Sequence, residues 1–182
     1  MKICILGSGA YGLALASRFI KNNNEVVCYS NNQNEIDGLV SSRISDKLPS
    51  YNIDKRIEFT TDIKRAVSNS NLVVIAVPAK FASSVTKELS NYLTKDMHIL
   101  IATKGIENDT CLFLNDVVEK NLNTNKIAVI SGPTFAVDIV KDVPIGLTLA
   151  TLNSSTKELV KKLLVSDITK LRDTADLIGV EV

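Results

Sequence analysis

The sequence predicts a doubly wound α/β domain, with a mostly parallel sheet and helices on both of its faces. Short apolar runs that favour strands alternate along the chain with segments whose apolar residues recur at helical spacing. The run at 71–78 is almost continuously apolar rather than alternating, which is typical of a strand covered by helices on both sides. At 182 residues, the chain has the ordinary length of one such domain.

Seven segments are predicted as strands, because each is a short apolar run bounded by turn residues. They are residues 2–6, 25–29, 57–60, 71–78, 97–102, 126–130 and 145–151. Helices are predicted between them from apolar residues at spacings of three and four. One helix is predicted after the glycine-rich turn at 7–12, a second at 62–67, and a third through Val85, Leu89 and Leu93. A fourth is predicted at 110–121, and a fifth begins at Ser155.

Polar residues predict how several of these elements begin and are joined. Asp62 is expected to cap the helix at 62–67, and Ser155 with Glu158 is expected to form a capping box. Residues 41–56 are predicted as a long loop, of a kind that is often functional or mobile, because they are charged and lack periodicity. His98, the single histidine, lies inside a predicted strand and is interpreted as structural.

The composition excludes several classes of function. With 45% hydrophobic and 23% charged residues and a net charge of +1, the chain gives no reason to expect nucleic acid or an anionic membrane as a partner. No apolar run is long enough to span a bilayer, and the N-terminus enters a strand rather than a cleavable signal. Cys4, Cys28 and Cys111 lack metal-ligand spacing and a pairing pattern, so we expect no metal site and a reducing, cytoplasmic location.

The segment Gly7-Ser8-Gly9-Ala10-Tyr11-Gly12 joins the first predicted strand to the first predicted helix. In a Rossmann-like fold, Gly7 would permit the tight turn, Gly9 would let a pyrophosphate approach the backbone, and Gly12 would let the helix pack closely. The helix N-terminus would attract a phosphate through its free N–H groups. A glycine-rich turn can also be purely structural, but its position after a strand and before a helix favours dinucleotide binding.

The end of the second predicted strand bears on the choice between NAD and NADP. An acidic residue there would accept hydrogen bonds from the adenosine ribose of NAD, but Ser30, Asn31 and Asn32 follow the strand instead. Glu35 follows too late and is predicted to lie on the next helix. The asparagines are equally well interpreted as a turn and a helix cap, so the preference between the cofactors stays open.

Three predicted strands end in unusual sequence, at 7–12, 103–105 and 131–136, and we expect the chemistry to converge there. Lys104 could orient a substrate oxygen or phosphate, or could be an ordinary solvated lysine. Thr134 could meet a polar substrate, or could simply begin a helix after the turn at Gly132 and Pro133.

The ordered motifs Gly7–Gly12, Ala76-Val77-Pro78, Ala102–Ile106, Ser131–Ala136 and Gly179-Val180-Glu181 resemble bacterial NAD(P)-dependent glycerol-3-phosphate dehydrogenase, in its N-terminal cofactor-binding domain. The resemblance covers essentially the whole chain. It implies the interconversion of dihydroxyacetone phosphate and sn-glycerol 3-phosphate by hydride transfer with NAD or NADP, which supplies the backbone of phospholipids.

The resemblance also implies roles for individual residues. Cofactor contacts are implied for Gly7, Gly9, Ala10, Tyr11, Gly12, Asn31, Phe81, Lys104 and Ala136. Substrate contacts are implied for Lys104, Gly132 and Thr134. Tyr11 replaces a frequent Trp of the family, and Asn31 replaces the Arg that many members use for the NADP phosphate, which puts a strong NADP preference in doubt.

In the family, the proton-donating lysine and a helical substrate domain follow the Gly-Val-Glu motif, beyond Val182 of this chain. We therefore expect residues 1–175 to form an NAD(P)-binding domain and 176–182 to begin a linking helix. The chain alone is expected to bind cofactor with little or no turnover. Leu177, Ile178 and Val180 are expected to be exposed or to be buried by a second copy, so a homodimer is a hypothesis.

Two other functions fit the same residues. Another dehydrogenase of this fold, acting on a hydroxy acid, is opposed by the pairing of Thr103-Lys104-Gly105 with Gly132–Phe135. A non-catalytic dinucleotide-sensing module would be favoured by a coding sequence that stops directly after Val182.

Overall fold

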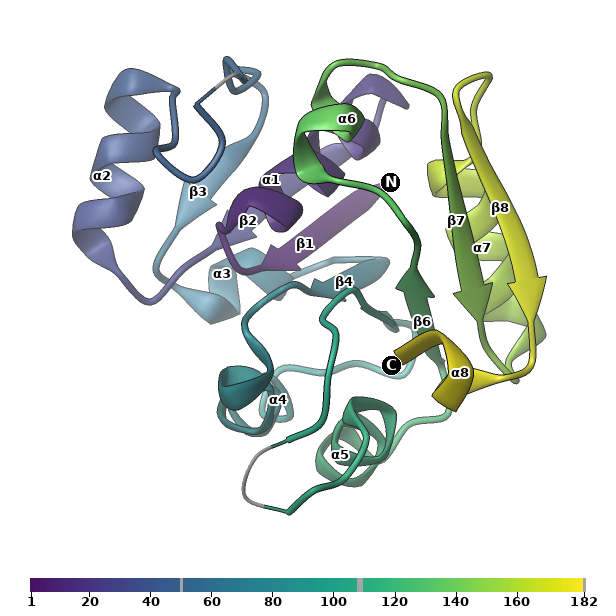
Figure 1. Cartoon of the computed structure of the whole chain (residues 1–182). Helices are drawn as coiled ribbons and strands as arrows, with labels where there is room; N and C mark the ends of the chain where they lie inside the picture. The colour runs from purple at the N-terminus through teal and green to yellow at the C-terminus, as the bar shows by residue number, and fades with distance from the viewer. Residues whose placement is uncertain (50, 108–109, 182) are drawn as a thin grey trace.

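A computed structural model describes residues 1–49, 51–107 and 110–181, and within them the chain forms one eight-stranded sheet (Figure 1). The order across the sheet is β3-β2-β1-β4-β5-β6-β7-β8. The strands are β1 (Lys2–Leu6), β2 (Glu25–Tyr29), β3 (Glu58–Thr60), β4 (Leu72–Ile75), β5 (His98–Ile101), β6 (Ile127–Ser131), β7 (Ile145–Ala150) and β8 (Thr169–Thr174).

The sheet is mostly parallel, as predicted, and its direction reverses once. Strands β1 to β6 pair in parallel, whereas β7 pairs antiparallel with β6, with Ile130 opposite Leu149. β8 pairs in parallel with β7. The chain crosses over β1 between β3 and β4, so the carboxyl ends of β1 and β4 flank the switch point where such sheets bind ligands.

Helices cover both faces of the sheet, as the sequence predicts. They are α1 (Ala10–Lys21), α2 (Gln33–Ser42), α3 (Ile63–Val67), α4 (Ala82–Leu89), α5 (Leu114–Leu122), α6 (Ala136–Val140), α7 (Ser154–Leu164) and α8 (Leu177–Glu181), with a 3₁₀ turn, η1 (Ala79–Phe81), before α4.

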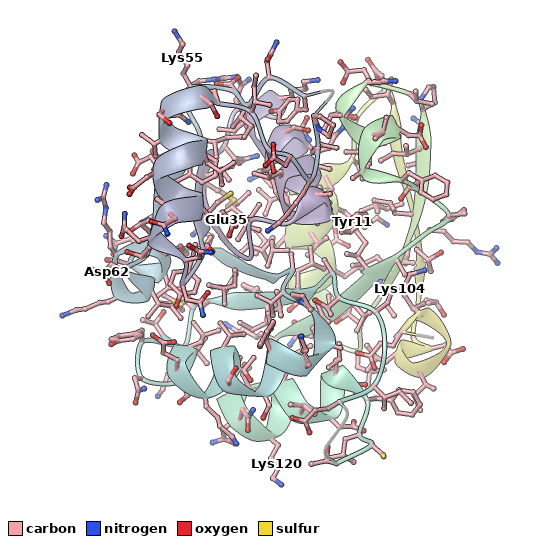
Figure 2. The ribbon with its side chains drawn as sticks, turned by 60° about the vertical axis from the view of Figure 1, so that its left-hand side comes forward. Tyr11, Glu35, Lys55, Asp62, Lys104 and Lys120 are labelled. Atoms are coloured by element: carbon pink, nitrogen blue, oxygen red, sulfur yellow. The ribbon has the colours of Figure 1, made fainter. Side chains whose placement is uncertain are left out.

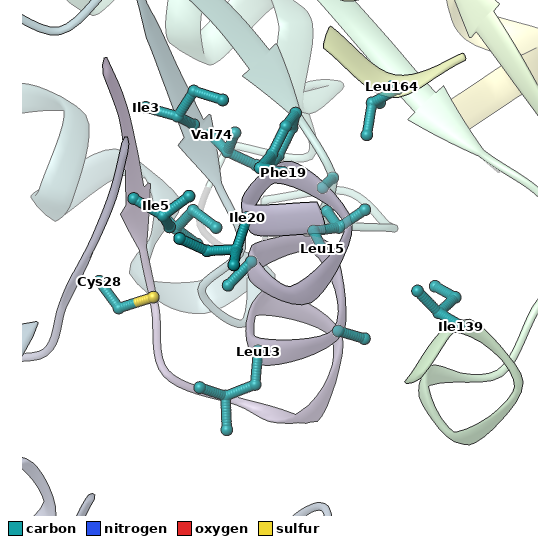
Figure 3. Close-up of a cluster of buried hydrophobic side chains, with 14 of the residues drawn as sticks. Ile3, Ile5, Leu13, Leu15, Phe19, Ile20, Cys28, Val74, Ile139 and Leu164 are labelled. Atoms are coloured by element: carbon teal, nitrogen blue, oxygen red, sulfur yellow. The ribbon is translucent and has the colours of Figure 1, made fainter. Parts of the chain in front are cut away.

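Alternate residues of the central strands bury against different layers. Ile3 and Ile5 belong to the core beneath α1, α2, α6 and α7, whereas Cys4 and Leu6 belong to the core beneath α3, α4, α5 and α8. Figure 3 shows the first core, with Phe19 of α1 among side chains from the strands. This alternation explains why the strands are apolar on both faces.

Strand β8 and the cap of α7 differ from the predictions. The sequence of β8, Thr-Lys-Leu-Arg-Asp-Thr, has no apolar run because β8 is an edge strand with much of its surface exposed. The predicted capping box at Ser155 is wrong: Asn153 caps α7, since its Oδ1 accepts from the Thr156 amide at 3.0 Å. Ser155 Oγ donates to that same oxygen at 2.7 Å. Asp62 caps α3 as predicted, accepting from the Arg65 amide at 3.1 Å.

Several predicted boundaries shift. The helix predicted at 110–121 begins only at Leu114, because Cys111 has a left-handed backbone (φ 56°) that interrupts a helix. α4 ends at Leu89, so Leu93 packs against the core from the following turn instead. α2 extends to Ser42, into the range predicted as a loop.

The loop that follows α2 is anchored to the rest of the domain. Leu48 and Ile53 are buried in the core, and the Ile53 amide donates to the Arg43 carbonyl at 2.8 Å. Arg43 Nη1 in turn donates to the Ile57 carbonyl at 2.8 Å. In the described ranges, the structure has no helix with the length and apolarity that a membrane crossing requires.

Candidate functional site

The turn between β1 and α1 has room only for glycine at Gly7 and Gly12. Gly7 has φ +120°, its amide donates to the Tyr29 carbonyl at 2.9 Å, and an added Cβ would lie 2.6 Å from the Ala76 carbonyl oxygen. An added Cβ at Gly12 would overlap the carbonyl oxygen of Gly7. The close packing of α1 against the ends of β1 and β4 therefore requires both glycines.

Gly9 differs, because an added Cβ there would meet nothing within 4 Å. Gly9 is the N-cap of α1, makes no side-chain cap, and is followed by no acidic residue in the first turn. In the described part of the chain, the start of α1 therefore has no side-chain cap, and its first-turn amides carry partial positive charge. This arrangement suits a phosphate group, and it fits the pyrophosphate of a dinucleotide.

At the end of β2, Asn31 is exposed and Asn32 caps α2, since Asn32 Oδ1 accepts from the Glu35 amide at 3.2 Å. Glu35 lies on α2, as predicted, but its carboxylate returns to the strand end. Ser30 Oγ donates to Glu35 Oε2 at 2.8 Å. No acidic residue directly follows β2 in the sequence, as predicted. The prediction that no carboxylate lies at this strand end is nevertheless wrong, because the side chain of Glu35 reaches it from α2.

Lys47 also bonds the Glu35 carboxylate, and Ser8 lies close enough to lower its pKa. Lys47 Nζ lies 2.5 Å from Glu35 Oε1. Burial raises the pKa of the Glu35 carboxyl. Hydrogen bonds from Lys47, Ser30 and the glycine-turn residue Ser8 lower the pKa by more than burial raises it, so the net shift is downward. The carboxylate therefore stays ionised between the glycine turn and β2.

Tyr11 and Thr134 join the glycine turn to the loop after β6. Burial raises the pKa of the Tyr11 phenol, and the neighbouring Thr134 hydroxyl partly offsets that rise. Thr134 Oγ1 is buried and, in the described part of the chain, has no hydrogen-bond partner of regular geometry. Two of the segments that the sequence predicts to converge are thus brought together.

Gly132 lets the loop after β6 lie directly on β7. An added Cβ at Gly132 would lie 2.8 Å from the Gly146 carbonyl oxygen and 2.9 Å from Leu147 Cδ2. The Thr134 amide then donates to the Gly132 carbonyl at 2.8 Å, which turns the chain toward α6. Ala136 begins α6 and is half-buried.

Lys104 follows β5 at the same edge of the sheet, where Figure 2 labels it together with Tyr11 and Glu35. Its side chain is exposed, and among the described residues it has no hydrogen-bond or ion-pair partner. The preceding Thr103 is fixed, because its Oγ1 donates to the Val77 carbonyl at 2.7 Å. Lys104 is thus a cation held at the predicted edge without a partner of its own.

Phe81 and His98 lie at different distances from this edge. Phe81, in η1 after β4, is 49% exposed, and Lys80 Nζ lies 4.9 Å from its ring centroid. His98 lies at the start of β5, the end remote from Lys104, with Nδ1 2.8 Å from Thr156 Oγ1. Burial, with Lys126 adding, lowers the pKa of His98, which favours the neutral ring. The structural interpretation of His98 fits this position.

The family model described as "NAD-dependent glycerol-3-phosphate dehydrogenase N-terminus" matches residues 2–157. The chain belongs to this family. Glycerol-3-phosphate dehydrogenase [NAD(P)+] of Thermoanaerobacter sp. (strain X514) is 32% identical over 181 residues, which cover 100% of this chain and 54% of that protein. The corresponding protein of Wolbachia pipientis wMel is 32% identical over 183 residues, covering 100% of this chain and 55% of the relative.

Solved structures of the family share the fold described above. Glycerol-3-phosphate dehydrogenase from Coxiella burnetii superposes with a TM-score of 0.94 at 26% identity, covering 99% of this chain and 55% of that one. The enzyme from Saccharomyces cerevisiae superposes with a TM-score of 0.85 at 15% identity. This chain thus spans about half the length of the curated relatives that it matches.

The Gly-Val-Glu motif lies in α8, which packs against β6 and β7 (Figure 1). The Gly105 amide donates to the Glu181 carbonyl at 3.3 Å, so α8 contacts the segment that carries Lys104. The expectation that Val180 is exposed or covered by a second copy is wrong, because the core of this chain buries it. Leu177 is partly buried, and Ile178 is 52% exposed.

No group of three or more metal-ligating side chains lies together in the described residues. The sequence interpretation missed the returning carboxylate of Glu35. Its signal is the order Ser30, Asn32, Glu35, in which a serine directly follows the strand and the third residue of the capped helix is acidic.

Proposed function

We propose that the chain is the NAD(P)-binding part of an oxidoreductase that interconverts dihydroxyacetone phosphate and sn-glycerol 3-phosphate. The observation that carries the proposal is the open N-terminus of α1 at Gly9, held against β1 and β4 by Gly7 and Gly12. The family of the chain and the printed names of its relatives support the substrate assignment.

The proposed cofactor path follows the carboxyl edge of the sheet. The pyrophosphate would lie on the first turn of α1, at Gly9, Ala10 and Tyr11, where the amides are open. The adenosine would extend over the end of β2 near Asn31. The nicotinamide would extend the other way, toward Phe81, Lys104 and Ala136, because these residues follow the strands on that side of the switch point.

Lys104, Gly132 and Thr134 are the proposed substrate residues. The exposed ammonium of Lys104 would hold a substrate oxygen or phosphate and stabilise negative charge that develops there. Thr134 Oγ1, which has no partner among the described residues, would hydrogen-bond a hydroxyl or carbonyl oxygen, and Gly132 would keep the backbone close to β7. The bound cofactor supplies or accepts the hydride.

We further propose that residues 1–175 form the cofactor domain and that 176–182 begin the connection to a substrate domain. The relatives are about twice as long as this chain, which supports assigning it only part of the catalytic machinery. The 182-residue chain by itself is then expected to bind cofactor but to turn over little or no substrate.

We place the protein in the cytoplasm, which fits Cys4 and Cys28 as free thiols buried in the core. The homodimer stays a hypothesis, and of the three residues that suggested it Ile178 is the most exposed. A monomeric mass at high concentration in light scattering would exclude the dimer.

Titration of the chain with NADH and with NADPH, followed by nicotinamide fluorescence at fixed salt, tests the proposal. Saturable binding of at least one cofactor is expected. Failure of both to bind, in a chain whose circular dichroism shows a folded α/β protein, would contradict the assignment of the glycine turn as a phosphate site.

A further inference from the structure

The side chain of Glu35 takes an unusual path for its position. Glu35 is the third residue of α2, after the cap Asn32, and a glutamate there commonly reaches back to the amide of the cap residue. In this chain Ser30 Oγ accepts from the Asn32 amide instead, at 3.3 Å. Ser30 Oγ also donates to Glu35 Oε2 at 2.8 Å, so the carboxylate is drawn to the end of β2.

This position lies between the two parts of the proposed cofactor path. Ser30 directly follows β2, which pairs with β1, and Ser8 belongs to the turn between β1 and α1. The Glu35 side chain is 19% exposed, so its carboxylate is largely enclosed by these neighbours and Lys47. A carboxylate offers about four acceptor positions, and the hydroxyl groups of a ribose are donors that can use those left free.

We propose that Glu35 selects NAD over NADP, by accepting a hydrogen bond from the adenosine ribose 2′-hydroxyl and by repelling a 2′-phosphate. The inference rests on the proposed function, because it assumes that the dinucleotide lies on the glycine turn. Glu35 follows Gly12 by about 20 residues, the spacing at which dinucleotide-binding folds of this class place an acidic residue for the ribose.

The charges around Glu35 decide which ribose substituent the site accepts. The hydrogen bonds from Lys47, Ser30 and Ser8 lower the Glu35 pKa overall, so the carboxylate carries its charge at neutral pH. Lys47 forms an ion pair with this carboxylate rather than standing free for a phosphate. Repulsion between the carboxylate and a 2′-phosphate would oppose NADP.

Arg43, which follows α2 directly, also has its guanidinium engaged. Its Nη1 donates to the Ile57 carbonyl at 2.8 Å, and its Cζ lies 5.5 Å from the centroid of the Phe59 ring. Binding a 2′-phosphate through Arg43 would break these contacts. Lys47 and Arg43 thus both have acceptors within the protein itself.

The test compares the affinities for NADH and NADPH in the chain and in two variants at fixed salt. We expect the unmodified chain to bind NADH at least about tenfold more tightly than NADPH. In Glu35→Gln the ratio of the two dissociation constants is expected to shift toward NADPH by about tenfold, because the charge and one acceptor are lost. Asp37→Asn removes an exposed carboxylate from the same helix and is expected to leave the ratio unchanged.

A third variant, Ser30→Ala, guards against a loss of folding in Glu35→Gln. Ser30→Ala keeps the charge of Glu35 but removes the hydroxyl that draws it to β2, and it is expected to weaken NADH binding more than NADPH binding. Circular dichroism and the thermal midpoint report folding separately. A purely structural role of Glu35 would change both affinities together and leave their ratio constant.

Each result bears on one of the two proposals. The inference would be overturned, with the dinucleotide site left intact, if the unmodified chain bound the two cofactors equally or preferred NADPH. It would also be overturned if the ratio of the two dissociation constants were unchanged in folded Glu35→Gln and Ser30→Ala. Binding of neither cofactor by the unmodified chain would overturn the proposed function together with the inference.

Discussion

The backbone amide of Asn115 donates to Glu181 Oε1 at 2.8 Å, and this bond ties the start of α5 to α8. Glu181 is only 1% exposed, and its Oε2 has no hydrogen-bond partner in the described part of the chain. Burial raises the pKa of Glu181 to about 7; the Asn115 amide lowers it and the neighbouring Asp116 raises it. Because burial raises its pKa to about 7, the Glu181 carboxyl is mostly neutral below that pH.

The first prediction concerns stability against pH. Between about pH 4.5 and pH 7 the folded chain binds more protons at Glu181 than the unfolded chain does, so this group makes the free energy of unfolding fall as the pH rises. Glu181→Gln is expected to remove that slope and to stabilise the chain at pH 8 by on the order of 2 kcal/mol. Urea denaturation between pH 5 and 8 measures both effects.

Glu158→Gln is the control for that experiment, because Glu158 is an exposed carboxylate on α7. It should leave the slope unchanged. A Glu181→Gln chain that is less stable than the unmodified one at pH 8 would show that the buried carboxylate is held in its charged form.

The second prediction separates phosphate binding from folding at the glycine turn. Gly9→Ala adds a Cβ that meets nothing in the protein but occupies the approach to the first-turn amides of α1. Cofactor affinity is expected to fall about tenfold or more, with the thermal midpoint nearly unchanged. Gly38→Ala also adds a Cβ in open space, on α2, and should retain full binding.

The third prediction concerns the contact between α1 and α6. Arg18, which is 3% exposed, donates through Nη2 to the Ile139 carbonyl and to Asp142 Oδ1, the latter at 2.6 Å. Arg18→Met leaves the buried Ile139 carbonyl without this donor and is expected to destabilise the chain by about 1–3 kcal/mol. The denaturant midpoint measures this loss, and amide hydrogen exchange in α6 should become faster.

Lys21→Met provides the comparison, because Lys21 bonds the same Asp142 from a side chain that is 39% exposed. Its effect is expected to stay below about 1 kcal/mol. Equal losses in both variants would mean that the buried carbonyl does not depend on Arg18.

The fourth prediction tests Lys104. Since its side chain is exposed and partnerless among the described residues, Lys104→Met is expected to leave the denaturant midpoint unchanged. The affinity of Lys104→Met for NADH or NADPH is expected to fall several-fold, because the variant lacks a cation at the carboxyl edge of the sheet. Lys55→Met, at another exposed lysine (Figure 2), should change neither quantity. Unchanged cofactor affinity in Lys104→Met would show that Lys104 does not contact the cofactor and contacts only the substrate or solvent.

Local patterns predicted the elements whose own sequence is distinctive. The strands at 2–6 and 25–29 have the observed bounds, because in each a charged residue is followed by four apolar or aromatic residues and then by a glycine or a polar residue. The glycine turn was predicted in its correct place, since the close contacts of Gly7 and Gly12 leave no choice of residue. β8 was missed because a half-exposed edge strand needs no apolar run.

Other features depend on residues that are far apart in the chain. The antiparallel direction of β7 depends on how the segment after α6 returns to the sheet, which the apolar pattern of β7 does not contain. Asn153 instead of Ser155 caps α7, because the cap depends on which side chain reaches the Thr156 amide. Val180 is buried by strands that precede it in sequence, although the residues around it suggested an exposed helix.

The sequence by itself determined the α/β class, the place of the glycine-rich turn and the family, because these depend on periodicity and on residue types at fixed spacing. Only the tertiary structure decided that Glu35 returns to the end of β2 and that Thr134 lies beside Tyr11. The physical reason is that packing between elements sets the partners of a side chain. This packing brings Lys47, in the loop after α2, to Glu35 on α2. Spacing along the chain reports none of those distances.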